Sequence, residues 1–320
     1  MRCRFNGSIV ATALAAAAVS AVVSISVTRT TGQAARPART AAGKPNFNGV
    51  WQALNEANWD LQAHEARSGM VTQKGVYDYE YARVPAAPVL ALGAAAGVPG
   101  SLGVVQGDGQ IPYKPDAAAI KQQYSENWID RDPELKCYLP GIPRAMYMPY
   151  PFAIVQGTDK IQMTYAFSNA GRVIHMNKVE GPPDDTYMGH SVGRWEKDTL
   201  VVEVTNFNGK NWFDRAGNFH SDALHLVERY SPISPDAIRY EVTIEDPNVF
   251  TRSWTIAMPL YRRLETNATV IDYPCMEFAE EFMYGHLRKE QLVKRWEGET
   301  IIVDITRKIP PGDVRDWYRR

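Results

Sequence analysis

The chain has 320 residues, of which 45% are hydrophobic and 22% are charged, with a formal net charge of -1. This composition is that of a globular protein with a sizeable core. The nearly neutral charge argues against a nucleic-acid partner, since phosphate binding requires a basic surface. The 34 aromatic residues (16 Tyr, 10 Phe and 8 Trp), with 21 Pro and 23 Gly, favour β-structure with many turns.

The N-terminus has the layout of a secretory signal. Arg2 and Arg4 carry positive charge, residues 8–27 form an uncharged apolar run, and residues 32–34 are compatible with cleavage. We expect residues 1–34 to direct the chain to the periplasm or the exterior. An uncleaved anchor is the alternative, because the run is long for a signal. No second apolar run of that length follows, so we expect no membrane contact beyond this segment.

Export changes the interpretation of the three cysteines. Cys3 leaves with the signal, and Cys137 and Cys275 remain. An even pair in an oxidising compartment predicts one disulfide, with two unpaired buried thiols as the alternative.

The next residues divide into a leader and one domain. Residues 35–45 lack periodicity and are expected to form a disordered leader, and residues 46–320 a single β-rich domain. The domain opens with a Gly-X-Trp strand at Trp51. Helices are expected at 55–67, 116–127 and 276–291, and a long surface excursion at 84–115.

From residue 151 the pattern is that of β-strands separated by short turns. The expected strands are 152–156, 161–167, 173–176, 192–195, 199–207, 223–230, 238–244 and 251–261. Strand-turn-strand units at this spacing predict a mainly β fold, an antiparallel barrel or sandwich with short helical insertions. Residues 192–205 also align with 293–306, and Trp, Glu and Thr recur in register. Both segments are therefore predicted to be hairpins, through internal repetition or through convergence on favourable turn chemistry.

A longer motif carries a resemblance. The segment MGHSVGRWEKDTLVV begins at Met188. It resembles the MGHSxGxWEGDTLVV core of an uncharacterised family of exported bacterial β-rich proteins, and the likeness covers roughly residues 47–254 and the region around Cys275. The WExDTLV hairpin is also similar to one in lipocalin-like (calycin) barrels, which implies a lipocalin-like barrel. The length and the helical insertions of this chain depart from a simple eight-stranded barrel.

Four histidines fall in the central part of the chain: His175, His190, His220 and His225. They are the candidates for a divalent metal site, but they lack the close spacing of a zinc motif. We therefore predict no cofactor and treat a divalent metal as the alternative. The leading hypothesis is acid–base chemistry by His190 and His225, supported by Asp214, Asp222 and Glu228. A structural ion pair of such a carboxylate with Arg172, Arg194 or Arg229 is the competing interpretation.

The remaining candidates concern a ligand pocket. Ser191 lies in a bare Gly-X-Ser-X-Gly pattern, but a strand follows it where a nucleophile elbow requires a helix. The expected binding residues are Tyr187, Met188, Trp195, Asn206, Asn211, Trp212, His220 and Arg229, and Phe213 and Phe219 are expected to add apolar surface. Ordinary core packing is the alternative for the aromatic residues.

The sequence therefore predicts an exported enzyme of isomerase, hydratase or lyase type that acts on a small apolar or aromatic molecule in a barrel pocket. The alternatives are a non-catalytic binding or carrier protein of lipocalin type, and a structural envelope protein without a small-molecule site.

Overall fold

The computed structural model describes residues 37–66, 99–126, 128–276, 292–297 and 300–308. The signal segment, residues 84–98 of the expected excursion and all but the first residue of the helix expected at 276–291 lie outside these ranges.

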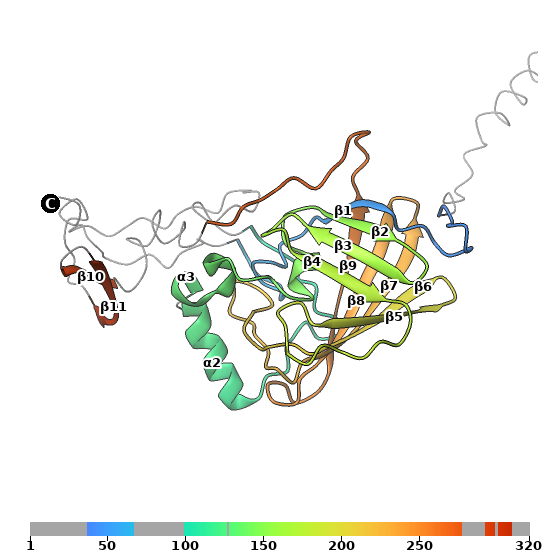
Figure 1. Cartoon of the computed structure of the whole chain (residues 1–320). Helices are drawn as coiled ribbons and strands as arrows, with labels where there is room; N and C mark the ends of the chain where they lie inside the picture. The colour runs from blue at the N-terminus through green and yellow to red at the C-terminus, as the bar shows by residue number, and fades with distance from the viewer. Residues whose placement is uncertain (1–36, 67–98, 127, 277–291, 298–299, 309–320) are drawn as a thin grey trace, which may run out of the picture. The chain divides into compact units, whose positions relative to one another are not determined.

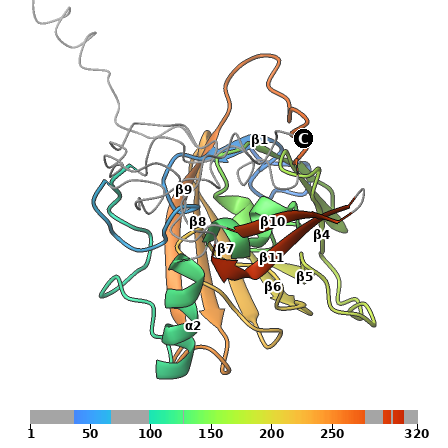
Figure 2. The ribbon, with the colours of Figure 1, turned by 90° about the vertical axis from the view of Figure 1, so that its left-hand side faces the viewer.

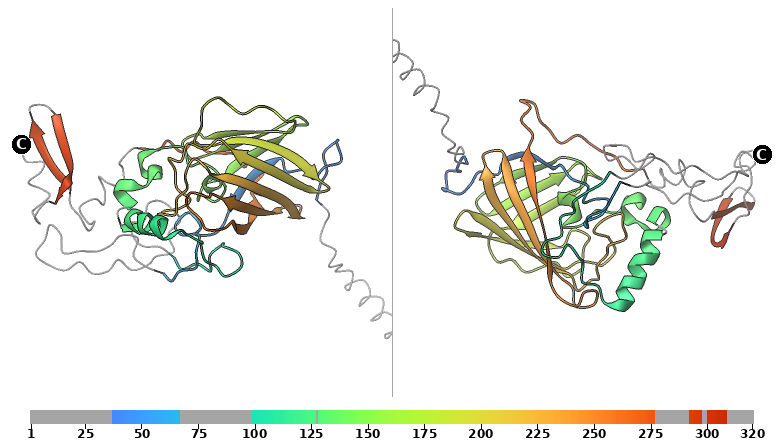
Figure 3. Two further views of the ribbon diagram at one scale, coloured as in Figure 1. Left: turned by 90° about the horizontal axis from the view of Figure 1, so that it is seen from below. Right: turned by 180° about the vertical axis from the view of Figure 1, so that it is seen from behind.

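Nine strands form one closed barrel (Figures 1 and 3). They are β1 (Gly49–Ala53), β2 (Phe152–Gln156), β3 (Lys160–Tyr165), β4 (Gly171–His175), β5 (His190–Glu196), β6 (Thr199–Thr205), β7 (His225–Ser234), β8 (Ala237–Glu245) and β9 (Trp254–Arg262). Each strand pairs with its sequence neighbours, and β1 closes the barrel by pairing with β9. All neighbours are antiparallel except β4 and β5, which are parallel. The predicted mainly β, lipocalin-like barrel with short helical insertions is confirmed.

The two ends of the barrel are built differently. Short turns at 157–159, 197–198 and 235–236 lie at one end, which we call the turn end. The long connections 54–151, 206–224 and 246–253 lie at the other end, which we call the loop end. Because function concentrates on loops held by a rigid scaffold, the loop end is the place to look for a site.

Trp51 helps to close the turn end. Its indole Nε1 donates to the carbonyl O of Phe47 at 2.8 Å, and the guanidinium of Arg262 lies 4.2 Å from the ring centre. Phe47 in turn packs on Trp195, with ring centres 5.8 Å apart. Gly49 has a φ of +134°, and a Cβ there would collide with Arg262. The Gly-X-Trp pattern thus lets the backbone pass close to the residue that covers the tryptophan.

The residues before β1 also contact the turn end. Arg39 forms an ion pair with Asp198 in the β5–β6 turn, at 2.7 Å. Lys44 lies over the Trp195 ring at 5.7 Å and donates to the carbonyl O of Lys197. Residues 37–45 therefore lie against the barrel and are not the disordered leader that their composition predicted.

The helices belong to the loop end. The predicted helix at 116–127 is confirmed as α2 (Pro115–Glu126), followed by α3 (Trp128–Arg131) and two short 3₁₀ turns, η1 (Pro133–Lys136) and η2 (Arg144–Met146). Figure 2 views the barrel from the side on which α2 lies. The helix predicted at 55–67 is wrong. The side chain of Asn55 accepts from the N–H of Ala57, and that of Asp60 accepts from the N–H of Gln62. These local hydrogen bonds stabilise turns in place of a helix.

Cys137 and Cys275 form a disulfide, as predicted, across a sequence separation of 138 residues. It ties the segment after β9 to the segment after η1. The repeated hairpin is β5–β6 in the barrel, and β10 (Leu292–Glu297) and β11 (Thr300–Lys308) form a second antiparallel hairpin, as predicted. Among the described helices, none has the length and apolarity needed to cross a membrane.

Candidate functional site at the loop end

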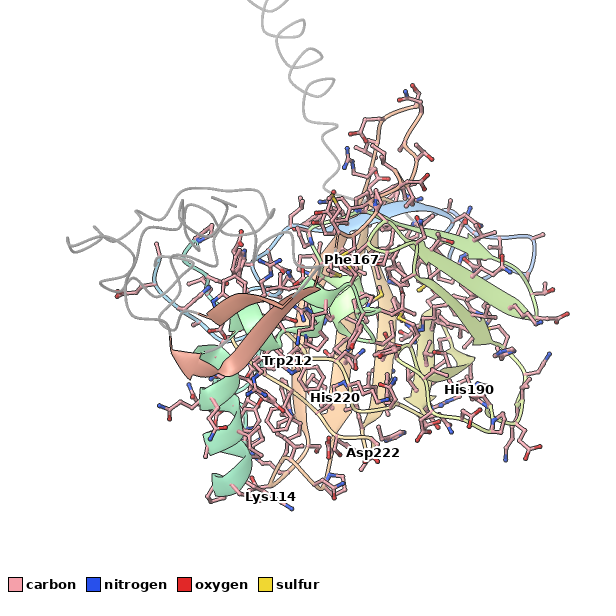
Figure 4. The ribbon with its side chains drawn as sticks, turned by 60° about the vertical axis from the view of Figure 1, so that its left-hand side comes forward. Lys114, Phe167, His190, Trp212, His220 and Asp222 are labelled. Atoms are coloured by element: carbon pink, nitrogen blue, oxygen red, sulfur yellow. A yellow bond between two sulfur atoms is a disulfide. The ribbon has the colours of Figure 1, made fainter. Side chains whose placement is uncertain are left out.

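The four histidines that the sequence singled out do not form one group. His175 and His190 are neighbours, with ring centres 5.5 Å apart, whereas His220 and His225 belong to other parts of the chain. His175 ends β4, His190 begins β5 and His225 begins β7. Each alternates with inward-facing, buried neighbours, so all three side chains belong to the outer face. His220 is buried in the β6–β7 connection. Figure 4 shows His190 well apart from His220.

His190 and His225 are not brought together. Strand β6 runs between their strands, and His190 pairs with Thr205 of β6 whereas His225 pairs with Glu245 of β8. The Nε2 atom of His190 lies 3.1 Å from the carbonyl O of Val179, and Nδ1 of His225 lies 3.2 Å from a carboxylate O of Glu245. The expectation that these two imidazoles meet in one hollow is wrong, because strand alternation places both on the outer surface.

Glu228 faces the barrel interior and is fully paired there. Its carboxylate forms an ion pair with Arg172, and the hydroxyls of Tyr230 and Tyr240 each donate to its Oε1 at 2.8 Å. Burial, and after it the charge of Glu228, raises the pKa of both tyrosines well above the ordinary value, so both phenols remain donors. Each charge in this cluster has a partner, which favours the structural interpretation of Glu228.

Ser191 belongs to the same interior cluster. It is buried on β5, and its Oγ accepts from the Nε of Arg172 at 2.9 Å. Strand β5 leads through a tight turn into β6, so the strand-to-helix turn of a nucleophile elbow is absent at this serine. The glycine pattern around Ser191 therefore does not indicate a hydrolase site.

Apolar side chains fill the rest of the barrel. The following residues of the barrel strands have at most 4% of their surface exposed: Phe152, Ile154, Ile161, Met163, Tyr165, Ile174, Leu200, Val202, Val204, Leu226, Ile238, Val242, Ile244, Ile256, Met258 and Leu260. A barrel of this strand number has an interior that side chains are able to fill. The loop end is therefore a better candidate for a ligand site than the centre of the barrel.

The β6–β7 connection covers the loop end with a short hairpin, in which Trp212 and Phe219 form a β-bridge. We call residues 212–219 the cap hairpin. Trp212 stacks on Tyr124 of α2 with ring centres 4.6 Å apart, and Phe219 stacks on Tyr113 at 6.0 Å. The cap hairpin therefore joins the barrel to α2 through aromatic contacts.

Asp214, in the cap hairpin, is fully buried. Its carboxylate accepts from the backbone N–H of Leu61 at 2.9 Å, from the backbone N–H of Asn218 at 3.1 Å and from the side-chain amide of Asn218 at 2.6 Å. Burial, and after it the nearby charge of Asp60, raises the pKa of Asp214 to about 7. A carboxyl group that titrates near neutral pH is suited to proton transfer.

A hydrogen-bonded chain connects Asp214 to a part-buried phenol. The hydroxyl of Tyr113 donates to the amide O of Asn218 at 3.0 Å, and the amide N of Asn218 donates to Asp214. Burial, and after it the charge of Asp214, raises the pKa of Tyr113 well above the ordinary value. Tyr113 therefore remains a donor and fixes the orientation of Asn218 against the carboxylate.

His220 and Asn211 form a second polar group beside the cap hairpin. The Nε2 atom of His220 lies 2.8 Å from the amide O of Asn211, and its Nδ1 lies 2.8 Å from the carbonyl O of Ser221. The amide N of Asn211 donates to the carbonyl O of Tyr187 at 3.1 Å. Burial lowers the pKa of His220. The ring centre of Phe213, the residue before Asp214, lies 5.2 Å from that of the imidazole.

The other expected site residues are dispersed. Trp195 packs at the turn end, and Arg229 pairs with Glu196 on the outer face. Asp222 is exposed in the connection before β7, Met188 is buried, and Asn206 has a left-handed φ of 59° after β6. Tyr187 contacts Asn211 only through its backbone carbonyl, and its ring packs on Tyr138. Of the sequence-predicted set, the structure thus collects Asn211, Trp212, Asp214 and His220 at the cap hairpin, together with Phe213 and Phe219.

A buried ionic network at the loop end escaped the sequence interpretation. Arg144 pairs with Asp132 and with Glu134, and Glu134 also pairs with Arg215. The guanidinium of Arg215 lies 4.8 Å from the ring centre of Trp59 and 5.4 Å from that of Trp128. Burial opposes ionisation of Glu134, but the charges of Arg215 and Arg144 outweigh it and lower the pKa of Glu134 to about 2. The only sequence signal was the density of charged residues and prolines between residues 131 and 144.

Within the described ranges, no three or more His, Cys, Asp or Glu side chains are grouped so as to hold a metal ion. Comparisons with protein-family models, with curated proteins and with solved structures find no match for this chain. A functional proposal therefore depends on the chemistry of the loop end itself.

Proposed function

We propose that the protein is an exported enzyme that performs acid–base chemistry, of isomerase, hydratase or lyase type, on a small apolar or aromatic molecule at the loop end of the barrel. Asp214 is the group that transfers the proton. The observation that carries this proposal is the environment of Asp214: a fully buried carboxyl beside Asp60, with three N–H donors and a pKa raised to about 7.

The three hydrogen bonds give Asp214 a defined role. They hold the carboxylate in one orientation, and the pKa leaves a large fraction in each protonation state near pH 7. The ionised form would accept a proton from an activated C–H or from water, and the protonated form would return it. Tyr113, through Asn218, is a positioning residue for the carboxyl group.

The surroundings favour an apolar substrate with one hydrogen-bond acceptor. Phe213 lies between His220 and Trp254, and its ring centre is 5.8 Å from that of Trp254. The indole N–H of Trp254 is buried and lacks a hydrogen-bond partner among the described residues. A carbonyl oxygen of the substrate would satisfy this donor. Because Asp214 is fully buried, the substrate would reach it through movement of the cap hairpin.

Export is part of the same proposal. The N-terminal sequence has the layout of a secretory signal. The disulfide between Cys137 and Cys275 is compatible with an oxidising compartment. Together they support a periplasmic or secreted location.

Proton transfer to carbon is tested without knowing the natural substrate. The protein is incubated in D₂O with a panel of small aromatic ketones, and loss of the acidic C–H signal is followed by NMR. We expect exchange of at least one ketone above the buffer rate, loss of that exchange in Asp214→Asn, and retention in Asp246→Asn. Asp246 is the matched control, because it is a buried carboxylate at the same end that binds Ser221. No exchange of any ketone, or equal exchange by the Asp214→Asn variant, contradicts the proposal.

The aromatic groups of the cap hairpin favour a second candidate function, binding or carriage without chemistry. Trp212 and Tyr124 form a stacked pair beside Phe219. A carrier would quench its tryptophan fluorescence on binding a ketone of the panel, with equal affinity in the wild type and Asp214→Asn, and would cause no deuterium exchange. Binding accompanied by exchange that depends on Asp214 favours the enzyme.

A further inference from the structure

Two histidines lie side by side on the outer face of the barrel. His175 and His190 belong to β4 and β5, the parallel pair of strands. Ile174 and Ser191, which pair with each other, are buried, so their sequence neighbours His175 and His190 share the outer face. The centres of the two imidazole rings are 5.5 Å apart, with planes inclined by 33°.

This separation is that of two ligands on one metal ion. A zinc–nitrogen bond is about 2.0–2.1 Å long, which places the ring centres of two imidazoles on a tetrahedral ion about 5 Å apart. Small rotations about the side-chain bonds of His175 or His190 would therefore suffice for both rings to reach one ion.

A backbone contact prepares one of these rings. The Nε2 atom of His190 lies 3.1 Å from the carbonyl O of Val179. Because a carbonyl oxygen only accepts, Nε2 is the donor in this hydrogen bond, which leaves Nδ1 as the ring nitrogen to bind a metal ion. Ligand histidines commonly donate their second N–H to a backbone carbonyl, which fixes the tautomer and the ring orientation. The contact with Val179 is an observation independent of the spacing of the two rings.

We propose that His175 and His190 bind one divalent transition-metal ion of the zinc or copper class. Imidazole nitrogen is a preferred donor for these ions. With two protein ligands among the described residues, water would complete the coordination shell and leave positions open to exchange. This site does not include Asp214, so its test is independent of the test of the proposed enzyme activity.

Lys160 provides an internal electrostatic test. It pairs directly with His175 across β3 and β4, and its positive charge acts on that imidazole. A cation bound at His175 would be repelled by Lys160. Replacing Lys160 with Gln should therefore strengthen metal binding without removing a ligand.

The barrel also supplies a matched control. His225 lies on the same outer face as His190. On β6, which runs between them, Thr205 pairs with His190, and the preceding residue, Val204, pairs with Leu226, the residue after His225. His225 therefore lies two strands from His190 at a similar height, and its ring contacts Glu245 instead of a second histidine.

The experiment is calorimetric titration of the full chain, purified without a histidine tag, with ZnCl₂ and separately with CuCl₂. We expect one ion per chain, a loss of affinity of about tenfold or more in His175→Ala and in His190→Ala, no change in His225→Ala, and tighter binding in Lys160→Gln. Circular dichroism of each variant checks that the barrel is intact. Absence of binding, or equal affinity of the His190→Ala and His225→Ala variants, overturns the proposal.

Discussion

Replacing Asp214 with Asn should remove a large pH dependence of stability. Burial and the charge of Asp60 raise the pKa of Asp214 from 3.8 to about 7. Between these values the folded protein holds a proton that the unfolded chain has released, so stability falls as the pH rises and the loss is complete above the folded-state pKa. The difference between these two pKa values corresponds to about 4 kcal/mol across this window.

The asparagine side chain of this variant does not titrate, so the variant should lack this slope. In the wild type, Leu61 and Asn218 donate three hydrogen bonds to the carboxylate of Asp214. The side-chain NH₂ of the asparagine in the variant would face one of these donors and could not accept its hydrogen bond. This mismatch costs about 1–3 kcal/mol at every pH. We therefore expect the stability of Asp214→Asn relative to the wild type to increase by about 3 kcal/mol from pH 5 to pH 8, with the mismatch adding the same cost at each pH.

The assay is urea unfolding, with the disulfide intact, at intervals from pH 5 to pH 8. The measured quantity is the difference in the free energy of unfolding between variant and wild type. In this difference, the contributions of titrating groups that the substitution does not affect cancel. Asp246→Asn is the control, since it loses contacts with Ser221 but leaves Asp214 in place, and it should keep the wild-type slope. A wild-type slope in Asp214→Asn would refute the assigned environment of this carboxyl group.

Three further outcomes test other parts of the structure. Glu228→Gln breaks the buried pair with Arg172 and should lower the free energy of unfolding by about 3–5 kcal/mol, measured by urea unfolding; a loss below about 1 kcal/mol contradicts the pairing. Replacing Cys137 and Cys275 with Ser should lower it by roughly 3–5 kcal/mol, and mass spectrometry of the wild type under non-reducing conditions checks the bridge. Lys197 has a left-handed φ of 56°, a conformation that costs a non-glycine residue about 1–2 kcal/mol. Lys197→Gly should therefore raise the melting temperature, and an unchanged or lower melting temperature contradicts this strain.

The contrast between correct and wrong predictions has a local reason. Strand alternation placed Glu228 and His225 on opposite faces of one strand, which the structure confirms. Alternation alone did not predict which face of β5 and which face of β7 points into the barrel. It also did not predict that β6 lies between His190 and His225. The helix expected at 55–67 failed because Asn55 and Asp60 bond to nearby backbone groups, a preference that hydrophobic spacing does not reveal.

Periodicity, local turn chemistry and composition were sufficient to predict the β-rich class, most strands, the helix at 116–127 and the disulfide. The closure of the barrel could not be predicted in this way, because it depends on the pairing of β1 with β9, the first and last strands of the barrel. The tertiary structure also decided which polar residues are buried together. Asp214 acquires its raised pKa from burial and from Asp60, which is far from it in sequence, and Arg172 meets Glu228 only inside the closed barrel. Long-range burial and charge, which the linear order of residues does not encode locally, therefore selected Asp214 from the sequence-predicted candidates.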